Sequence, residues 1–284
     1  MPKPPRKVLI EDLVFAEGPR WRGSHLYLSD MFGHRVLRVG MDGKAETLLE
    51  RRQRPSGLGP APDGSVLVVS MLDRKVLRRA PDGGVTELAD LSAHVGGDTN
   101  DLLLAPGGWC YVSNFGFDLF GGAEARLTNL HRVDADGTIT EVARDLNFPN
   151  GMVLTPDGRT LIVAETFGHA LTAFDVGPRG DLSHRRIFAP LGERTPDGIC
   201  LDAEGGVWIA SFVTGEFVRV REGGDVTDVI ALDGDRAVAC TLGGPDGRTL
   251  FMLVAQTDIE RLARGDSSAR VEYTQVSVAA SGSP

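Results

Sequence analysis

A turn that recurs along the whole chain, each time followed by a short apolar run, is the feature that most constrains the fold. The turns contain glycine, in half of them after Pro-Asp, and are Trp21-Arg-Gly23, Pro62-Asp-Gly64, Pro106-Gly-Gly108, Pro156-Asp-Gly158, Asp202-Ala-Glu-Gly205 and Pro245-Asp-Gly247. The runs that follow are rich in β-branched, aromatic and leucine residues and cover 26–28, 66–69, 109–112, 161–164, 207–210 and 250–253. Runs this short between turns predict β-strands rather than helices. The chain is therefore expected to repeat one β-unit six times.

A second, more polar hairpin follows each run. Examples are the strands 34–39, 75–78, 130–133 and 217–220, which turn at Asp42-Gly43, Asp82-Gly83, Asp136-Gly137 and Gly223-Gly224. Glycine supplies the positive φ angle that a tight hairpin needs. Apolar and charged residues alternate in these strands, which is typical of a strand with one face buried against a neighbouring sheet.

Six such units predict an all-β fold, a six-bladed β-propeller of four-stranded blades that forms a single domain over residues 1–284. Division of 284 residues by six gives about 47 residues per unit, which is within the range of propeller blades. The early strand 7–10 is expected to pair with the last blade near 271–276, because this pairing closes the ring and removes an open edge. A pair of β-sandwiches is the alternative architecture.

Composition excludes several classes of partner. The net charge is −9 and no basic stripe is visible, which argues against a nucleic-acid partner. No segment approaches the roughly 20 apolar residues of a membrane span. Cys110, Cys200 and Cys240 are odd in number and form no C-x-x-C pair, so we expect buried free thiols in a cytoplasmic protein. The sequence gives no expectation for the oligomeric state.

The residues that open the innermost strands of the six units are the candidate site. In order they are Glu17, Ser56, Asn100, Asn150, Asp197 and either Cys240 or Thr241. Each Asp or Asn alone is explained as a turn residue, since Asp-Gly and Asn-Gly are common turn pairs. Four oxygen-bearing side chains at one register of a closed ring instead favour a shared site for one hard divalent cation. Calcium, magnesium or manganese suits such ligands, and zinc remains open although no histidine stands at these positions.

Three motifs carry a resemblance to a known family. They are Ala16-Glu-Gly-Pro-Arg-Trp21, Phe148-Pro-Asn-Gly-Met152 with Thr155-Pro-Asp-Gly-Arg159, and Pro196-Asp-Gly-Ile-Cys-Leu-Asp-Ala-Glu-Gly205. Together they resemble the senescence marker protein, regucalcin and gluconolactonase family over nearly the whole chain. The resemblance implies that Glu17, Asn150 and Asp197 bind one divalent metal ion, with calcium as the first expectation, and that Asp197 is also the candidate general base. It implies that Asn100 matches a position that contacts substrate in some members and metal in related fluorophosphatases.

The chain departs from the sugar-lactonase pattern beside Asn100. Sugar lactonases of the family carry an arginine just before this asparagine, whereas Asp98 and Thr99 stand here. The loop beyond, 114–122, presents Phe115, Phe117 and Phe120 in place of acidic residues. These rings either cover the blade edge or cap the mouth of the site as an apolar lid. We therefore expect a lactone or ester less polar than an aldonolactone, with Asn100, Phe115 and Phe117 in contact with it.

The function that the resemblance implies is metal-dependent hydrolysis of a lactone or a related ester. A calcium-dependent phosphotriesterase or fluorophosphatase is the first alternative, because it uses the same electrophilic metal. A non-catalytic propeller that serves as a binding scaffold is the second. The Gly-x-Ser-x-Gly, His-Glu-x-x-His and Gly-x-x-x-x-Gly-Lys motifs of other hydrolases and nucleotide-binding proteins do not occur in the sequence.

Overall fold

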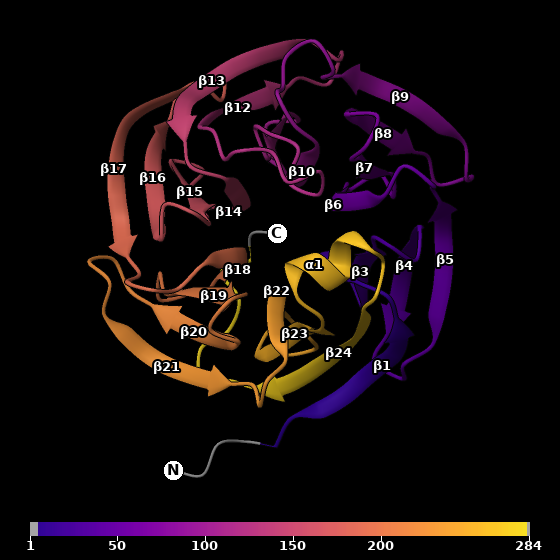
Figure 1. The fold of residues 1–284 in the computed structure, drawn as a ribbon, viewed down its shortest axis with the longest axis vertical. Coiled ribbons are helices and arrows are strands. Elements are labelled where there is room, and N and C mark those ends of the chain that lie inside the picture. The colour runs from indigo at the N-terminus through magenta and orange to yellow at the C-terminus, as the bar shows by residue number, and fades with distance from the viewer. Residues whose placement is uncertain (1–4, 283–284) are drawn as a thin grey trace.

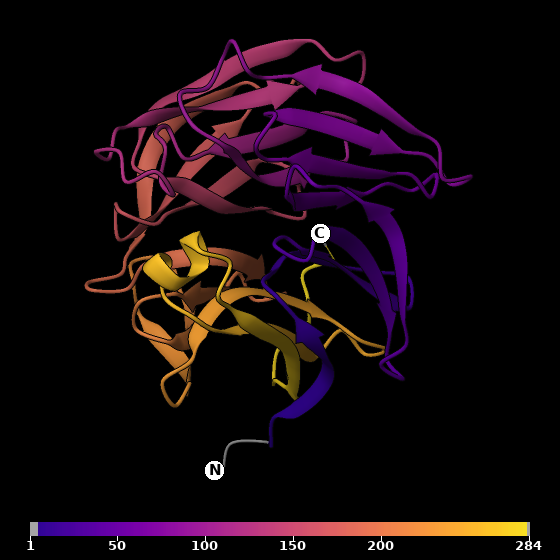
Figure 2. The ribbon, with the colours of Figure 1, turned by 45° about the vertical axis from the view of Figure 1, so that its right-hand side comes forward.

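The computed structural model describes residues 5–282, and these residues form a ring of six four-stranded antiparallel sheets around a central axis (Figure 1). The prediction of a six-bladed β-propeller is confirmed. In the five blades built from consecutive strands, the first strand lies nearest the axis and the last lies at the perimeter. The oblique view in Figure 2 shows the outer strands wrapping the side of the ring.

Five blades are built from consecutive strands. Blade one contains β2 (Ala16–Arg22), β3 (His25–Asp30), β4 (Arg35–Gly40) and β5 (Ala45–Glu50), and blade two contains β6 (Pro55–Pro60), β7 (Val66–Ser70), β8 (Lys75–Arg79) and β9 (Val85–Asp90). Blade three contains β10 (Thr99–Leu104), β11 (Cys110–Asn114), β12 (Thr128–Val133) and β13 (Ile139–Leu146). Blade four contains β14 (Pro149–Leu154), β15 (Thr160–Glu165), β16 (Ala170–Val176) and β17 (Leu182–Pro190), and blade five contains β18 (Pro196–Leu201), β19 (Val207–Ser211), β20 (Glu216–Val220) and β21 (Val226–Ala231).

The sixth blade joins the two ends of the chain. Its inner strands are β22 (Arg236–Gly243), β23 (Thr249–Gln256) and β24 (Ser268–Gln275), and its outer strand is β1 (Lys7–Leu13). Lys7 lies opposite Tyr273 in this antiparallel pairing. The predicted closure of the ring is therefore confirmed, and it leaves no unpaired edge on β24.

Burial follows the position of a strand in its blade. The second strands are almost wholly buried, as in β7 and β19, whereas the perimeter strands β5, β9 and β21 are largely exposed. The apolar runs of the sequence are these second strands, because neighbouring blades cover both of their faces. The cores between blades are thus made by the runs that the sequence analysis identified. The three cysteines are buried free thiols, as expected.

The innermost strands of neighbouring blades are so close that their backbones are in contact. A Cβ atom on Gly151 of β14 would lie 2.7 Å from the Asp197 carbonyl oxygen of β18, and one on Gly198 would lie 2.3 Å from the Ala239 Cβ of β22. Only glycine fits directly after Asn150 and after Asp197, because any side chain there would clash with the inner strand of the next blade. A register shift interrupts each inner pairing at this point, as between Pro149 and Met152.

The structure corrects the sixth position of the ring. Because Gly198 packs against Ala239, the residue level with Asp197 in blade six is Val238, and not Cys240 or Thr241. Cys240 is instead buried between blades five and six, with its Sγ atom 3.8 Å from that of Cys200. No glycine marks the register in β22, so the sequence offered no signal for it.

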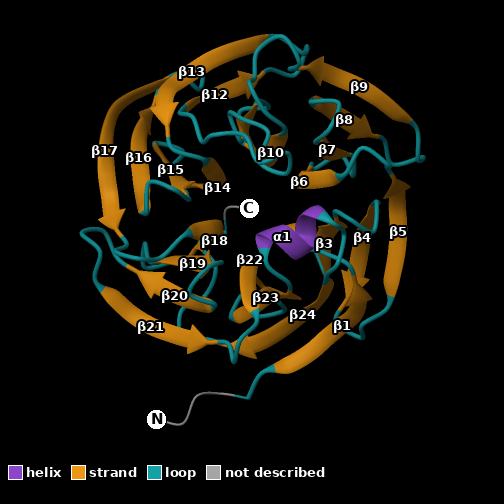
Figure 3. Cartoon of the chain, in the orientation of Figure 1, coloured by secondary structure: helices purple, strands orange, loops and turns teal. Residues whose placement is uncertain are grey.

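A short helix, α1 (Ile259–Ala263), lies between β23 and β24 and reaches toward the axis over one face of the ring (Figure 3). The Asp258 side chain caps it by accepting a hydrogen bond from the Arg261 amide. Its inward residue Leu262 is 3% exposed. In residues 5–282 no helix has the length and apolar character needed to cross a membrane.

Candidate active site

A pocket of about 220 Å³ opens at the end of the ring where the innermost strands begin. Its polar lining consists of Glu17, Asn100, Asn150, Thr166, Thr195 and Asp197. Its apolar lining consists of Phe15, Met31, Phe115, Leu119, Phe120, Phe148, Phe167, Phe212, Val213, Ile259 and Leu262. Four oxygen-bearing residues predicted from the repeat, on blades one, three, four and five, thus line one pocket. Ser56 and Val238 are not part of this lining.

The two asparagines are held by a chain of hydrogen bonds. Asn100 Nδ2 donates to Asn150 Oδ1 at 2.9 Å, and Asn150 Nδ2 donates to Thr166 Oγ1 at 3.2 Å. Thr166 Oγ1 in turn donates to the Pro196 carbonyl oxygen at 2.7 Å, which ties blade four to blade five. Asn150 Oδ1 accepts one hydrogen bond, from Asn100, and keeps a second lone pair that a cation could use.

Burial disfavours the charged forms of the two carboxyl groups of the pocket. Burial raises the pKa of Asp197 to about 8, with a further contribution from the Asp101 carboxylate, while a hydrogen bond from Asn150 acts in the opposite direction. Burial likewise raises the pKa of Glu17 well above its ordinary value, and the negative charges of Asp197 and Asp101 add to this. Asp197 Oδ1 is buried and has no hydrogen-bond partner among the described residues.

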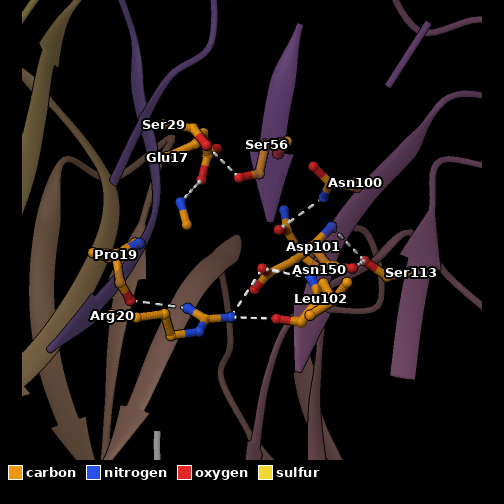
Figure 4. Close-up of polar contacts among 11 residues, drawn as sticks. Glu17, Pro19, Arg20, Ser29, Ser56, Asn100, Asp101, Leu102, Ser113 and Asn150 are labelled. Atoms are coloured by element: carbon orange, nitrogen blue, oxygen red, sulfur yellow. Dashed lines mark hydrogen bonds and ion pairs between the residues drawn. The ribbon is translucent and has the colours of Figure 1, made fainter. Parts of the chain in front are cut away.

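A buried ion pair, which the sequence patterns did not predict, lies next to Glu17 (Figure 4). Arg20 Nη2 lies 3.0 Å from Asp101 Oδ1 and donates to the Leu102 carbonyl oxygen at 2.6 Å. Asp101 occupies the position at which the inner strands of blades two, four and five have glycine. A charged residue at a glycine position of the repeat is the signal that would have identified it.

The donor set and the charges fit one divalent cation. Glu17, Asp101 and Asp197 supply three carboxylates, and Arg20 next to them supplies one positive charge, which leaves two negative charges when all are ionised. The unpaired Asp197 Oδ1 and the amide oxygen of Asn150 are hard ligands suited to such an ion. In the part of the chain that the structure describes, no three His, Cys, Asp or Glu side chains group as a metal site. Any site here therefore depends on amide oxygens as well as carboxylates.

The aromatic loop 114–122 contributes two of its three rings to the pocket. Phe115 lines it and stacks on Phe148 with ring centroids 4.7 Å apart, and Phe120 also lines it. Phe117 differs from expectation because it does not line the pocket. It packs behind the wall, 5.9 Å from Phe148 and 6.2 Å from Phe167.

Much of the remaining wall was not anticipated from the sequence. Phe148 and Phe167 come from loops of blade four, Phe212 from blade five, and Leu262 from α1. Each belongs to a connection at the same end of the ring as the start of the inner strands. Loops have no periodic pattern, so their residues are located only once the ring is closed.

Comparison with known proteins identifies the family. The sequence profile of the SMP-30/Gluconolactonase/LRE-like region matches residues 15–256. Pentonolactonase XacC of Haloferax volcanii is 28% identical over 289 residues, covering 98% of this chain and 96% of that protein. Regucalcin of Danio rerio is 27% identical over 266 residues, covering 90% and 89%. The solved structure of a gluconolactonase from Xanthomonas campestris aligns with a TM-score of 0.75 at 26% identity, covering 94% of this chain and 89% of that one. This chain therefore belongs to the SMP-30/gluconolactonase/LRE-like family.

Proposed function

We propose that the protein is a metal-dependent hydrolase that opens a lactone or a closely related ester. The observation that carries the proposal is the meeting of Glu17, Asn100, Asn150 and Asp197, from four different blades, in one pocket. A scaffold with no chemistry has no need for an unpaired buried carboxylate oxygen, which is destabilising unless a cation or substrate pairs with it. The lactonases among the relatives support the same class of reaction.

Glu17, Asn150 and Asp197 are the residues that would hold the metal ion. Hard oxygen ligands favour calcium, magnesium or manganese, and the similarity to regucalcin, of which one solved relative is described as calcium-binding, gives calcium priority. When bound, a divalent cation supplies positive charge that polarises the lactone carbonyl and stabilises the oxyanion developing in the transition state.

The protein's own residues then handle the proton and the substrate. The carboxylate of Asp197 accepts a proton from the water that attacks the carbonyl carbon. The same proton is available for the ring oxygen when its bond to the carbonyl carbon breaks, so the products are the hydroxy acid and an unchanged enzyme. Asn100, whose side chain is positioned by Asn150, orients the substrate or the water. Phe115 contacts the substrate from the wall of the pocket, and Phe117 supports that wall from behind.

The proposal is tested by metal analysis together with a lactone screen. We expect about one divalent ion per chain, loss of activity on chelation and recovery on add-back. Asp197→Asn and Glu17→Gln are expected to lower metal affinity and kcat/KM by about 100-fold or more. Asp157→Asn is the matched control. Asp157 lies in a second copy of the Thr-Pro-Asp-Gly sequence that contains Asp197, but its side chain is exposed and outside the pocket. Full metal content and activity in Asp197→Asn would refute the assignment.

The phosphotriesterase alternative is separated by assaying phosphotriesters beside lactones on the same metal-loaded preparation. Preference for the phosphotriesters would overturn the lactone assignment while leaving the metal site intact. The cellular location is proposed to be the cytoplasm, since three buried free thiols suit a reducing compartment.

A further inference from the structure

Above its polar base the pocket offers almost nothing to bind hydroxyl groups. Among the described residues that line it there is no lysine, arginine or histidine. The hydroxyl of Thr166 donates to Pro196, and the hydroxyl oxygen of Thr195 accepts from the Val213 amide at 2.9 Å. A polyhydroxylated ring would therefore leave its hydroxyls without partners against an apolar wall, which is unfavourable.

One side of the wall is a continuous series of aromatic rings. Phe120 and Phe115 are 6.2 Å apart, Phe115 stacks on Phe148 at 4.7 Å, and Phe148 lies 4.6 Å from Phe167. Because each ring packs against another, their positions are fixed before a substrate arrives. A preformed apolar surface of this kind binds apolar groups without a large ordering cost.

The other side is formed by blade five and α1, and its outer part is exposed at the mouth. Leu262 anchors α1 because it is 3% exposed, whereas Ile259 on the same helix is 44% exposed. Val213, which follows β19 of blade five, is 58% exposed, and Phe167 on the aromatic side is 38% exposed. Large apolar side chains that line a pocket and remain open to solvent at its rim mark a binding surface.

We propose that the lactone opened here carries an apolar alkyl or aryl substituent, which lies along the rim formed by Phe167, Val213 and Ile259 while its carbonyl group faces the polar base. This inference rests on the proposed function and names its substrate class. The three rim residues determine specificity for the substituent and take no part in the reaction at the carbonyl.

The test compares lactones of one ring size on the metal-loaded protein. The series contains the unsubstituted ring, rings with alkyl chains of increasing length, and a polyhydroxylated ring. We expect kcat/KM to rise about three- to fourfold per methylene over the first few carbons, the factor that burial of one methylene group provides. The polyhydroxylated lactone is expected to be the poorest substrate. Titration calorimetry with the corresponding lactams, which resist hydrolysis, reports the same preference without turnover.

Ile259→Ser is the informative variant, and Ile187→Ser is its matched control. Ile187 is 59% exposed on the perimeter strand β17, so the same substitution there removes a similar side chain far from the pocket. Ile259→Ser is expected to lower kcat/KM for the alkyl lactones by about tenfold more than kcat/KM for the unsubstituted ring. Ile187→Ser is expected to change neither.

The outcomes separate this inference from the proposed function. If lactones are hydrolysed but chain length has no effect, or the polyhydroxylated ring is preferred, the substituent proposal is wrong and the hydrolase assignment stands. If alkyl lactams bind tightly but no lactone is opened, the hydrolase assignment fails and apolar recognition is supported. An equal loss on all substrates in Ile259→Ser would show that α1 has only a structural role, which also overturns the proposal.

Discussion

At the scale of single residues, Asp197 and Asp157 show how little the local sequence decides. Both lie in the tetrapeptide Thr-Pro-Asp-Gly. Asp157 is an exposed turn residue whose pKa is lowered by a hydrogen bond from the Thr155 hydroxyl. Burial instead raises the pKa of Asp197. The position of each residue in the ring separates the two, so the candidate ligands were predictable from their register in the repeat. The Arg20–Asp101 pair has no counterpart in the other repeats and was not predictable.

The raised pKa of Asp197 predicts the pH dependence of stability in the metal-free protein. Between its ordinary value near 3.8 and the folded value of about 8, the folded protein holds a proton that the unfolded chain releases. This contribution to stability is therefore complete below about pH 4 and is lost as the pH rises toward 8, and Glu17 shifts in the same direction. The thermal unfolding midpoint in chelator should fall over this range by an amount equivalent to a few kcal/mol.

Two comparisons check this origin. A saturating divalent cation should abolish the decline, because the ionised carboxylates then have a partner, and metal affinity should rise with pH. Asp197→Asn should flatten the metal-free profile. A midpoint that rises with pH in the metal-free wild-type protein would contradict the assignment of these groups.

At the scale of elements, the glycine-containing turns made most of the strands predictable. Where such a signal is absent, as in the register of β22 and in α1, the structure was not predicted. The Pro-Asp-Gly turns mark the strand that follows them, and those strands were located to within a few residues. Blade six lacks a glycine at the inner contact, where Ala239 is small enough to pack, so its register was misjudged. Helix α1 is only five residues long, and the Asp258 cap was its one local signal.

The close contact between inner strands predicts that Gly151→Ala damages both the fold and the site. Gly151 does not have a positive φ, so alanine is allowed by its own backbone, and the damage comes from contact with backbone atoms of β18 at 2.7 to 2.9 Å. We expect destabilisation by about 3 kcal/mol in urea unfolding. Metal affinity should also fall in calorimetric titration, because Asn150 and Asp197 are forced apart.

Gly158→Ala supplies the control for this prediction. Gly158 has φ +71° and nothing within 4 Å of the added Cβ atom, so only backbone strain is introduced. That strain is expected to cost about 1 kcal/mol without changing metal affinity. If Gly151→Ala were as mild as Gly158→Ala, the inner strands would not be fixed by this contact.

At the scale of the whole molecule, ring closure turns a sequence repeat into a site. Neighbours in the pocket such as Glu17 and Asp197 are far apart in the chain, and symmetry alone brings their strand starts to one end of the axis. The apolar wall does not follow the repeat, since it comes from loops of unequal length and from α1. The polar residues of the pocket base were thus predictable as a set, whereas the shape of the pocket required the folded ring.

Because β1 completes the sixth blade, a chain that begins at Val14 is expected to lose stability and to self-associate. Its removal exposes the backbone edge of β24, and it also removes Leu13, which is 3% exposed. Urea unfolding should show a lower midpoint, and size-exclusion chromatography should show larger species. A synthetic peptide of residues 5–14 should reduce these species by pairing with β24.

Val8→Ser in the full chain is the control, because Val8 is 51% exposed and its backbone pairing is kept. Glu17 lies in β2 of blade one, only four residues after the end of β1, so loss of β1 should disturb its position. Metal affinity should therefore fall in the truncated chain and not in Val8→Ser. Equal urea midpoints for the truncated and full chains would show that the ring holds together without this strand.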